Sequence, residues 1–225
     1  MSKPRILITG ANGQLGNEFR MLESGFPGYE FIFLSRQDLS ITDKDSVQNV
    51  FKTYKPAWCV NCAAYTAVDK AESEREQAVA INATAAGLLA AACAQYNSGF
   101  IHISTDYVFD GSSAIPYREN DATGPINVYG ESKLLGEQLV MKNDPRAIII
   151  RTSWVYSFFG NNFVKTMMRL MKERESINVV EDQVGSPTYA ADLAQVIMHI
   201  ITQGSNASGI FHFSNEGRIS WYEFA

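Results

Sequence analysis

Tyr129 and Lys133 are the residues of this sequence whose types and spacing most directly suggest chemistry. They lie four residues apart in the stretch INVYGESKLLGE, residues 126–137, and in a helix that spacing places both side chains on one face. A free tyrosine has a pKa of about 10, and a nearby cation favours its phenolate form. The pair therefore predicts an acid–base tyrosine whose pKa is lowered by Lys133. The same spacing is common on solvated helix surfaces, so the interpretation depends on other motifs.

A glycine-rich turn near the N-terminus provides such a motif. Residues 5–9 form a short apolar stretch typical of a strand, GANGQLG follows at residues 10–16, and residues 17–24 have a helical pattern. We expect Gly10 to permit a tight turn, Gly13 to let the backbone approach a pyrophosphate, and Gly16 to let helix and strand pack closely. The spacing is G-x-x-G-x-x-G rather than G-x-G-x-x-G. Its position between a strand and a helix favours a dinucleotide site over an ordinary turn.

The end of the second predicted strand, residues 30–34, bears on the choice of cofactor. Arg36 stands near the position where an NAD-selective site usually places an acid, and it would instead meet a 2′-phosphate. Asp38 would lie at the adenine edge, and Leu39 completes this group of cofactor-binding candidates. We therefore expect NADPH to be preferred and NADH to be tolerated.

A hydroxyl residue follows the fourth predicted strand, residues 100–104. Thr105 would stand at the carboxyl edge of the sheet, where open α/β sheets bind ligands, and would hydrogen-bond the substrate oxygen that Tyr129 protonates. His102, inside that strand, is interpreted as a core histidine with satisfied hydrogen bonds. Asn82 is a polar residue in the long helix predicted over residues 68–95, and both a structural and a functional role are open. Trp154 follows the fifth predicted strand, residues 146–151, and suits either a plate for a sugar ring or a core tryptophan.

The order of the elements predicts the fold class. Five strand–helix units precede residue 156. Helices at 161–172 and 189–202 follow, with strands at 177–180 and 209–214, a loop at 182–188 and a helix beginning at residue 221. This order predicts an α/β fold with a doubly wound parallel (Rossmann) sheet and a small C-terminal cap. Residues 1–156 are expected to form an NAD(P)-binding domain, and residues 157–225 mainly substrate-binding cap elements interleaved with the last sheet elements.

Composition excludes several classes of function. The 225 residues are 46% hydrophobic with a net charge of −5 and scattered basic residues, which argues against a nucleic-acid partner. No signal-peptide pattern and no uninterrupted apolar window of membrane-spanning length occur, so we expect a cytoplasmic protein with no membrane partner. Cys59, Cys62 and Cys93 lack zinc-ligand spacing and are interpreted as small core residues in a reducing compartment. No metal site is predicted within the chain.

Six motifs together resemble the extended short-chain dehydrogenase/reductase family: GANGQLG, NCAAYTAVDKAE, STDYVFDG, NVYGESKLLGE, RTSWVYSFFGNNFVKTM and DQVGSPT. Within that family the combination is most similar to the dTDP-4-dehydrorhamnose reductases, and the similarity runs from residue 5 to the end of the chain. Each motif alone is shared by many sugar-nucleotide enzymes.

The resemblance implies an NAD(P)H-dependent reduction of the C4 keto group of dTDP-4-dehydro-L-rhamnose to dTDP-L-rhamnose. Tyr129 would protonate the sugar oxygen, Lys133 would lower the tyrosine's pKa and hold the nicotinamide ribose hydroxyls, and Thr105 would orient the carbonyl. The remaining implied residues are the phosphate cradle Gly10, Asn12, Gly13, Gln14, Leu15 and Gly16, the cofactor-flanking Ala64 and Tyr65, the sugar-pocket residues Thr66, Asp106, Tyr107 and Trp154, and Gln183, Pro187 and Thr188 on the nucleotide-sugar side.

Two matters stay open at this point. Members of this family usually continue for several dozen more residues, so the chain is expected to be truncated, and Mg²⁺ dependence and a homodimer would depend on that segment. A dehydratase or epimerase of the same fold is an alternative, but dehydratases typically carry Glu at the position of Tyr107. A non-catalytic regulatory subunit, like that of methionine adenosyltransferase, is another alternative, although the intact catalytic set argues against it.

Overall fold

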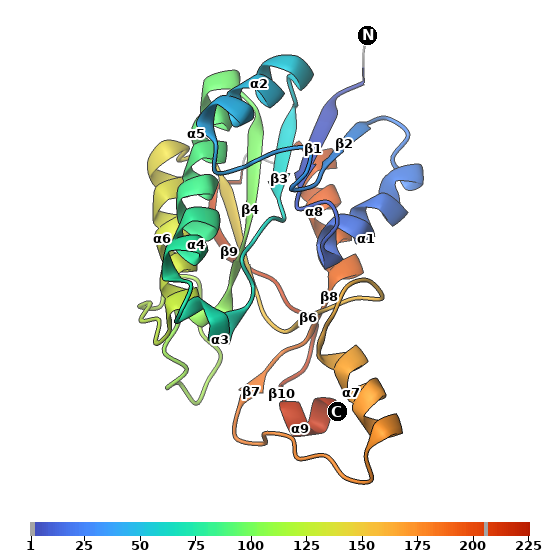
Figure 1. The fold of residues 1–225 in the computed structure, drawn as a ribbon. Coiled ribbons are helices and arrows are strands. Elements are labelled where there is room, and N and C mark those ends of the chain that lie inside the picture. The colour runs from blue at the N-terminus through green and yellow to red at the C-terminus, as the bar shows by residue number, and fades with distance from the viewer. Residues whose placement is uncertain (1–2, 205–206) are drawn as a thin grey trace.

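A single six-stranded parallel sheet forms the centre of the molecule, in the order β2-β1-β3-β4-β5-β9 (Figure 1). The computed structural model describes residues 3–204 and 207–225. The strands are β1 (Arg5–Thr9), β2 (Glu30–Leu34), β3 (Trp58–Asn61), β4 (Gly99–Thr105), β5 (Ile148–Thr152) and β9 (Gly209–His212). The chain order reverses between β1 and β3, which creates a switch point at the carboxyl ends of these strands. The predicted doubly wound fold is confirmed.

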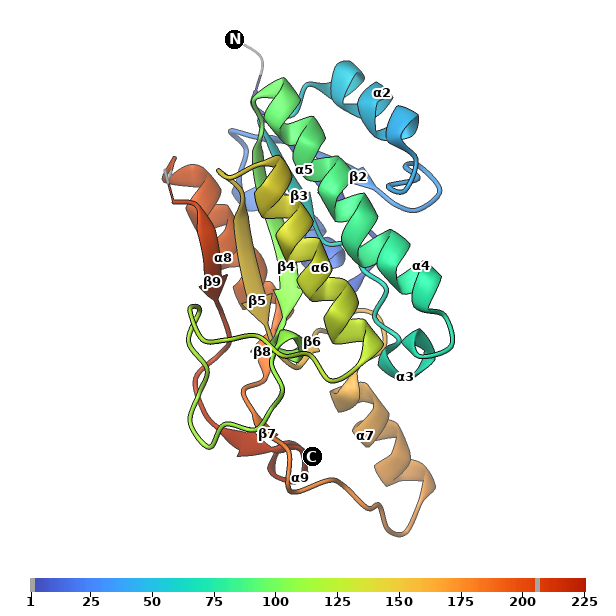
Figure 2. The ribbon, with the colours of Figure 1, turned by 90° about the vertical axis from the view of Figure 1, so that its left-hand side faces the viewer.

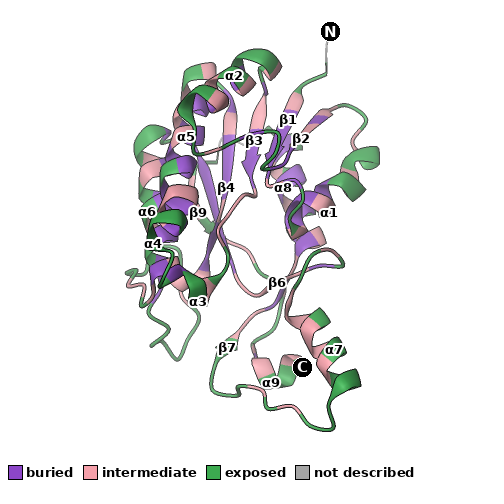
Figure 3. Ribbon diagram, in the orientation of Figure 1, coloured by how far each residue is buried: buried purple, intermediate pink, exposed green. Residues whose placement is uncertain are grey.

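Helices cover both faces of this sheet. On one face lie α2 (Lys44–Tyr54), α5 (Ala85–Tyr96) and α6 (Val128–Asn143), and on the other lie α1 (Gln14–Leu22) and α8 (Ala190–Thr202) (Figures 1 and 2). Because successive strand residues point to opposite faces, β1 contributes Leu7 to one core and Ile6 and Ile8 to the other. Figure 3 shows the strands buried between the two helical layers. Burial on both faces explains why the strands are continuous apolar runs rather than alternating ones.

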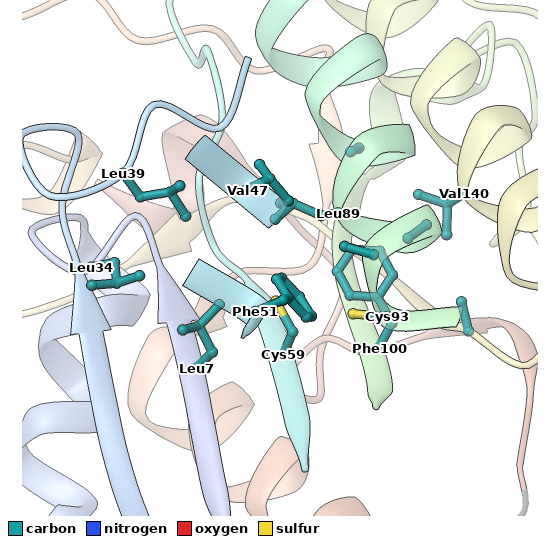
Figure 4. Close-up of a cluster of buried hydrophobic side chains, with 14 of the residues drawn as sticks. Leu7, Leu34, Leu39, Val47, Phe51, Cys59, Leu89, Cys93, Phe100 and Val140 are labelled. Carbon is teal, nitrogen blue, oxygen red and sulfur yellow. The ribbon is translucent and has the colours of Figure 1, made fainter. Parts of the chain in front are cut away.

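The core between the sheet and α2, α5 and α6 contains cysteine side chains as well as aromatic rings. Leu7, Phe51, Cys59, Cys93 and Phe100 are almost completely buried there (Figure 4). Cys59 and Cys93 are free thiols, and burial raises the pKa of Cys93 well above its ordinary value. Their interpretation as small core residues is confirmed.

The helix predicted over residues 68–95 is interrupted. It consists of α3 (Val68–Ala71), α4 (Arg75–Val79), a π-helical turn (Ala80–Thr84) and α5. Residues Arg75–Tyr96 form one continuous helical stretch that is long and apolar enough to cross a membrane by length and composition. More than half of its most apolar window is buried in the fold, where α5 packs against α2, α6 and β4, as expected for a core helix.

Short elements beyond β5 form the cap below the sheet (Figure 1). They are β6 (Val155–Tyr156), α7 (Phe163–Glu173), β7 (Val184–Gly185), β8 (Thr188–Tyr189), β10 (Ile219–Ser220) and α9 (Trp221–Phe224). The strand predicted at 177–180 is wrong, because that segment pairs with no other strand among the described residues. The loop predicted at 182–188 instead contains β7 and the first residue of β8, which pair with β10 and β6.

Two glycines bring α6 into direct backbone contact with its neighbours. A Cβ atom on Gly130 would overlap the Tyr107 carbonyl oxygen, and one on Gly136 would overlap the Asn82 carbonyl oxygen in the π turn. No side chain could fit at either contact without a shift of the backbone.

Gly136→Ala is therefore expected to destabilise the fold. The added methyl group must push α6 away from the π turn, and we expect the free energy of unfolding to fall by about 1–3 kcal/mol in urea titrations. Gly25→Ala is the matched control, because a Cβ there has nothing within 4 Å. Equal effects of the two substitutions would contradict the close-contact explanation.

Candidate active site

Polar side chains gather at the carboxyl ends of β1, β3 and β4. The Thr9 hydroxyl donates to Asn61 Oδ1 at 2.6 Å, and Asn61 Nδ2 lies 3.0 Å from His102 Nδ1. His102 is fully buried, and burial, with a contribution from the Lys133 charge, holds its pKa well below the ordinary value. It is a core histidine as predicted, but the expectation that its hydrogen bonds are satisfied is wrong, because Nε2 has no partner among the described residues.

Helix α6 carries Tyr129 and Lys133 one turn apart, as the spacing predicted. Its first turn is fixed by Asn127, whose side chain accepts a hydrogen bond from the Gly130 amide at 2.8 Å. Lys133 is only 2% exposed, and its ammonium group donates to the Ile103 carbonyl of β4 at 2.6 Å. Burial lowers the pKa of Lys133 to about 8, although the Glu137 carboxylate opposes this effect.

The predicted direction of the pKa shift of Tyr129 is wrong for this structure. Burial raises the pKa above the ordinary value of 10, and the hydrogen bond with Thr105 opposes the shift. Asp106 and Tyr107 add to the increase, whereas Lys133 makes no resolved contribution. The half-buried phenol therefore keeps its proton at neutral pH.

Thr105 ends β4 and links Tyr129 to Asp106. Its hydroxyl donates to Asp106 Oδ1 at 2.9 Å and accepts a hydrogen bond from the Tyr107 amide at 3.3 Å. The Tyr107 ring packs edge-on against Tyr129, with 5.4 Å between the ring centroids. Burial raises the pKa of Asp106 from 3.8 to about 6, even though the Thr105 hydrogen bond favours the carboxylate.

The glycine turn between β1 and α1 has the geometry that its sequence predicts. Gly10 adopts a φ of +63°, and a Cβ there would lie 2.6 Å from the Ala63 nitrogen after β3. A Cβ on Gly16 would lie 2.6 Å from Ala11 Cα, so this glycine permits the close packing of α1 on the turn. Gly13 is the N-cap of α1, and no side chain caps the helix there, which leaves its first amides available to an anion. Asn12 is exposed beside them, whereas the Leu15 side chain is buried in the core.

The Gln14 side chain connects this turn to the cap. Its Oε1 accepts a hydrogen bond from Asn162 at 3.0 Å, and its Nε2 lies 3.4 Å from the Val155 carbonyl. Asn162 is also the N-cap of α7, accepting from the Lys165 amide at 3.1 Å. This contact joins residues that are 148 positions apart in the sequence, and no local sequence pattern indicates it.

The three candidates after β2 differ in their surroundings. Arg36 is exposed at the carboxyl edge of the sheet. The Asp38 carboxylate accepts hydrogen bonds from the Ser35 amide at 2.9 Å and the Ser35 hydroxyl at 2.6 Å, which lowers its pKa. The Leu39 side chain is 3% exposed and packs in the core (Figure 4). It therefore does not face the cofactor edge, contrary to the prediction.

Asn82 has a structural role, in that it fixes the segment that follows β3. Its Oδ1 accepts a hydrogen bond from the Tyr65 amide at 2.8 Å, and its Nδ2 donates to the Tyr65 carbonyl at 3.0 Å and to the Ser132 hydroxyl of α6 at 2.9 Å. Ala64 and Tyr65 are thereby held between β3 and α6. The Tyr65 hydroxyl donates to Glu74 at 2.7 Å, which raises the pKa of Tyr65 to about 12.

A cavity of about 570 Å³ lies between the carboxyl edge of the sheet and the cap. Of the predicted substrate residues, Asp106, Tyr107, Trp154 and Gln183 line it, whereas Thr105 is buried and does not. Thr66 is exposed and does not line the cavity. Pro187 and Thr188 are buried, and Thr188 hydrogen-bonds through its hydroxyl to Thr152 at 3.1 Å, so these two residues lie behind a lining residue rather than in the cavity wall.

Trp154 occupies an unusual backbone conformation in the cavity wall. Its φ of +47° is in the left-handed region, which is strained for a residue with a large side chain. The indole stacks on Trp221, with 3.6 Å between ring centroids, and lies against Gly185, where a Cβ would come within 2.7 Å of the ring. The packing around the ring holds this conformation.

A buried ion pair beside the cavity was not foreseen. Arg151 of β5 makes a bidentate pair with Glu137 of α6, at 2.9 and 2.7 Å, and Glu137 also accepts from the Ser104 hydroxyl at 2.5 Å. The available signal was Arg151 itself, a charged residue directly after three isoleucines of the predicted strand. Among residues 3–204 and 207–225, no group of three or more His, Cys, Asp or Glu side chains could hold a metal ion.

The raised pKa of Asp106 predicts a pH-dependent stability. Because folding raises this pKa, the folded chain binds more protons between about pH 4 and pH 6, and the stability contributed by the protonated carboxyl is lost as the pH rises through about 6. Asp106→Asn should remove this loss, so its stability relative to wild type should increase over that interval in urea titrations. Asp182→Asn, an exposed residue of the same cavity, is the control, and its curve should run parallel to wild type. Parallel curves for all three proteins would contradict the prediction.

Known proteins match almost the entire chain. The model of the RmlD substrate binding domain family matches residues 4–225. A dTDP-4-dehydrorhamnose reductase of Aggregatibacter actinomycetemcomitans is 46% identical over 225 residues, which cover 98% of this chain and 76% of that protein.

Two solved structures share the fold closely. A dTDP-4-dehydrorhamnose reductase of Clostridium acetobutylicum has a TM-score of 0.94 at 45% identity, covering 98% of this chain and 77% of that one. The Bacillus anthracis enzyme of the same name, solved in complex with NADP, has a TM-score of 0.93 at 46% identity, covering 99% and 78%. This chain therefore belongs to the RmlD substrate binding domain family.

Proposed function

We propose that the protein reduces the C4 keto group of dTDP-4-dehydro-L-rhamnose to dTDP-L-rhamnose with NADPH or NADH. The observation that carries this proposal is that Thr105, Tyr129 and Lys133 come together where α6 meets the end of β4, next to Asp106 and Tyr107, which line the cavity. The three relatives described above are named dTDP-4-dehydrorhamnose reductases, which supports the choice of substrate.

The residues around the glycine turn fit a dinucleotide cofactor. The uncapped first turn of α1 offers amide donors to phosphate oxygens, and Gly13 at its start is exposed. Asn12, Gly13 and Gln14 lie at that turn, and Ala63 contacts it from the end of β3. In this proposal Ala64 and Tyr65 flank the cofactor and Lys133 holds its ribose hydroxyls. A nicotinamide cofactor held there would supply the hydride for C4 of the sugar. The solved relative with NADP supports a nicotinamide cofactor.

Tyr129 is the proton donor in this proposal. Because burial raises its pKa, the phenol is fully protonated at neutral pH and available to the C4 oxygen. When the proton leaves, the phenolate lies on the same helical face as the Lys133 ammonium and next to the Thr105 hydroxyl, both of which stabilise negative charge. Lys133 therefore stabilises the phenolate that forms when Tyr129 gives up its proton.

Tyr107 disfavours the dehydratase alternative. Its ring packs against Tyr129 at the position where a dehydratase would need a second base, and the carboxylates of this loop that line the cavity are those of Asp106 and Asp110. For the domain organisation, we propose an NAD(P)-binding unit of residues 1–156 and a substrate-binding unit drawn mainly from 157–225. The sheet itself extends into the second part, because β9 pairs with β5.

Tyr129→Phe tests the proposed acid. Removal of the hydroxyl leaves the ring packing in place, so we expect turnover of dTDP-4-dehydro-L-rhamnose, followed at 340 nm, to fall by about a hundredfold or more. Cofactor affinity, measured by fluorescence titration, should stay near wild type. Retained turnover would remove Tyr129 from the acid role.

Arg36→Asp tests the proposed cofactor preference. An acid at this edge would repel a 2′-phosphate and accept a hydrogen bond from a 2′-hydroxyl, so the affinity for NADPH should fall more than the affinity for NADH. The measurement is the ratio of the two dissociation constants, with Arg20→Asp on α1 as a control for net charge. An unchanged ratio would show that Arg36 does not meet the 2′-phosphate.

A further inference from the structure

The charged side chains that line the cavity are mostly acidic. They are Asp106, Asp110, Asp182, Arg151 and Arg218. Hydrogen bonds from Ser112 and Tyr117 lower the pKa of Asp110 to about 2, so it remains a carboxylate. The Arg151 guanidinium is already paired in bidentate fashion with buried Glu137.

Arg218 is the remaining cation of the described cavity wall. None of the ion pairs found among residues 3–204 and 207–225 includes it. Asp182 lines the same cavity but forms no ion pair with Arg218 in the described residues. Arg218 is therefore an exposed residue of the cavity wall that no carboxylate of the described residues pairs with.

The backbone on both sides of Arg218 is fixed to the cavity wall. Before it, the Gly217 carbonyl accepts a hydrogen bond from the Ser186 hydroxyl at 2.6 Å, and the Ser186 carbonyl accepts one from the Ser153 hydroxyl at 2.6 Å. After it, β10 pairs with β7, with Ile219 opposite Gly185. Arg218 thus projects from a held segment rather than from a free loop.

We propose that Arg218 binds the diphosphate group of the nucleotide-sugar substrate. This inference rests on the proposed function and names the residue that holds the charged part of that substrate. A guanidinium can donate two parallel hydrogen bonds to phosphate oxygens, which gives orientation as well as affinity. The diphosphate is joined to C1 of the sugar, across the ring from C4, so it must lie away from Tyr129.

The two walls of the cavity suit a substrate that lies in this direction, with C4 at one wall and the diphosphate at the other. Asp106 and Tyr107, next to Tyr129, form part of the sheet-side wall, whereas Gly185 and Arg218 belong to the cap. A sugar with its C4 oxygen at Tyr129 would direct C1 and the diphosphate toward the cap. Without Arg218 the diphosphate would meet a cavity whose free charges are carboxylates, and like charges repel.

Arg218→Gln and Arg218→Lys test the inference, with Arg174→Gln as the matched control. Arg174 is an exposed arginine of the cap, just after α7, and it does not line the cavity. Binding of dTDP and of thymidine is measured by calorimetry, without turnover. Arg218→Gln should weaken dTDP by about tenfold or more, the range of a lost charged hydrogen bond, while thymidine binding stays unchanged. Arg218→Lys should retain part of the dTDP affinity, and Arg174→Gln should bind as wild type does.

The kinetic readout separates binding from chemistry. With dTDP-4-dehydro-L-rhamnose, Arg218→Gln should raise KM by a similar factor and leave kcat within about twofold, because the interaction is the same in the ground state and the transition state. Wild-type dTDP affinity in Arg218→Gln, or equal losses in Arg174→Gln, would overturn the inference. If dTDP binding depends on Arg218 but no keto sugar is reduced, the diphosphate site stands and the proposed reaction fails. If Arg218→Gln leaves KM unchanged and turnover is normal, the proposed reaction stands and the diphosphate site at Arg218 fails.

Discussion

The site depends on how closely α6 approaches its neighbours. At Gly130 and Gly136 the helix touches the backbone of the loop after β4 and of the π turn, with no side chain between them. Such contacts leave little freedom for sliding or rotation, because close-packed interiors tolerate few displacements. Tyr129 and Lys133 therefore keep a fixed relation to Thr105 on one side and to the Tyr65 segment on the other. A catalytic geometry that must hold to a fraction of an ångström is thus set by backbone contacts rather than by flexible side chains.

The same helix face also organises the electrostatics. Tyr129, Lys133 and Glu137 follow one another at intervals of one turn, and each meets a different partner on the sheet. Lys133 reaches the Ile103 carbonyl, and Glu137 reaches Ser104 and Arg151. The buried Glu137–Arg151 pair cancels two charges close to the cavity. What remains near the reacting centre is a cation at Lys133 and a carboxyl at Asp106, a balance suited to a proton that must leave Tyr129.

Much of the scaffold could be predicted because it depends on local patterns. The strands are apolar runs, Gly10 and Gly16 sit where a side chain cannot fit, and Thr105 follows a strand at the sheet edge. The failures depend on contacts between segments that are distant in sequence. Nothing near Leu39 or Thr188 indicates that the fold buries them, and the Gln14–Asn162 contact joins the first turn to the cap. The pKa of Tyr129 was predicted in the wrong direction because spacing along a helix reveals a nearby cation but not the amount of burial.

The π turn at Ala80–Thr84 has a consequence for how this segment tolerates changes in length. A π turn holds one residue more than the α-helical ladder would need, so removing one residue there would restore a regular helix. Because the wide turn absorbs its extra residue locally, the segments before and after it would keep nearly the same phase after such a deletion. Asn82 now bonds to the Tyr65 segment and to Ser132 while α5 stays packed on the sheet. A deletion at 80–84 would therefore cost mainly these Asn82 bonds and the close approach of the turn to Gly136, and it would leave the packing of α5 in place.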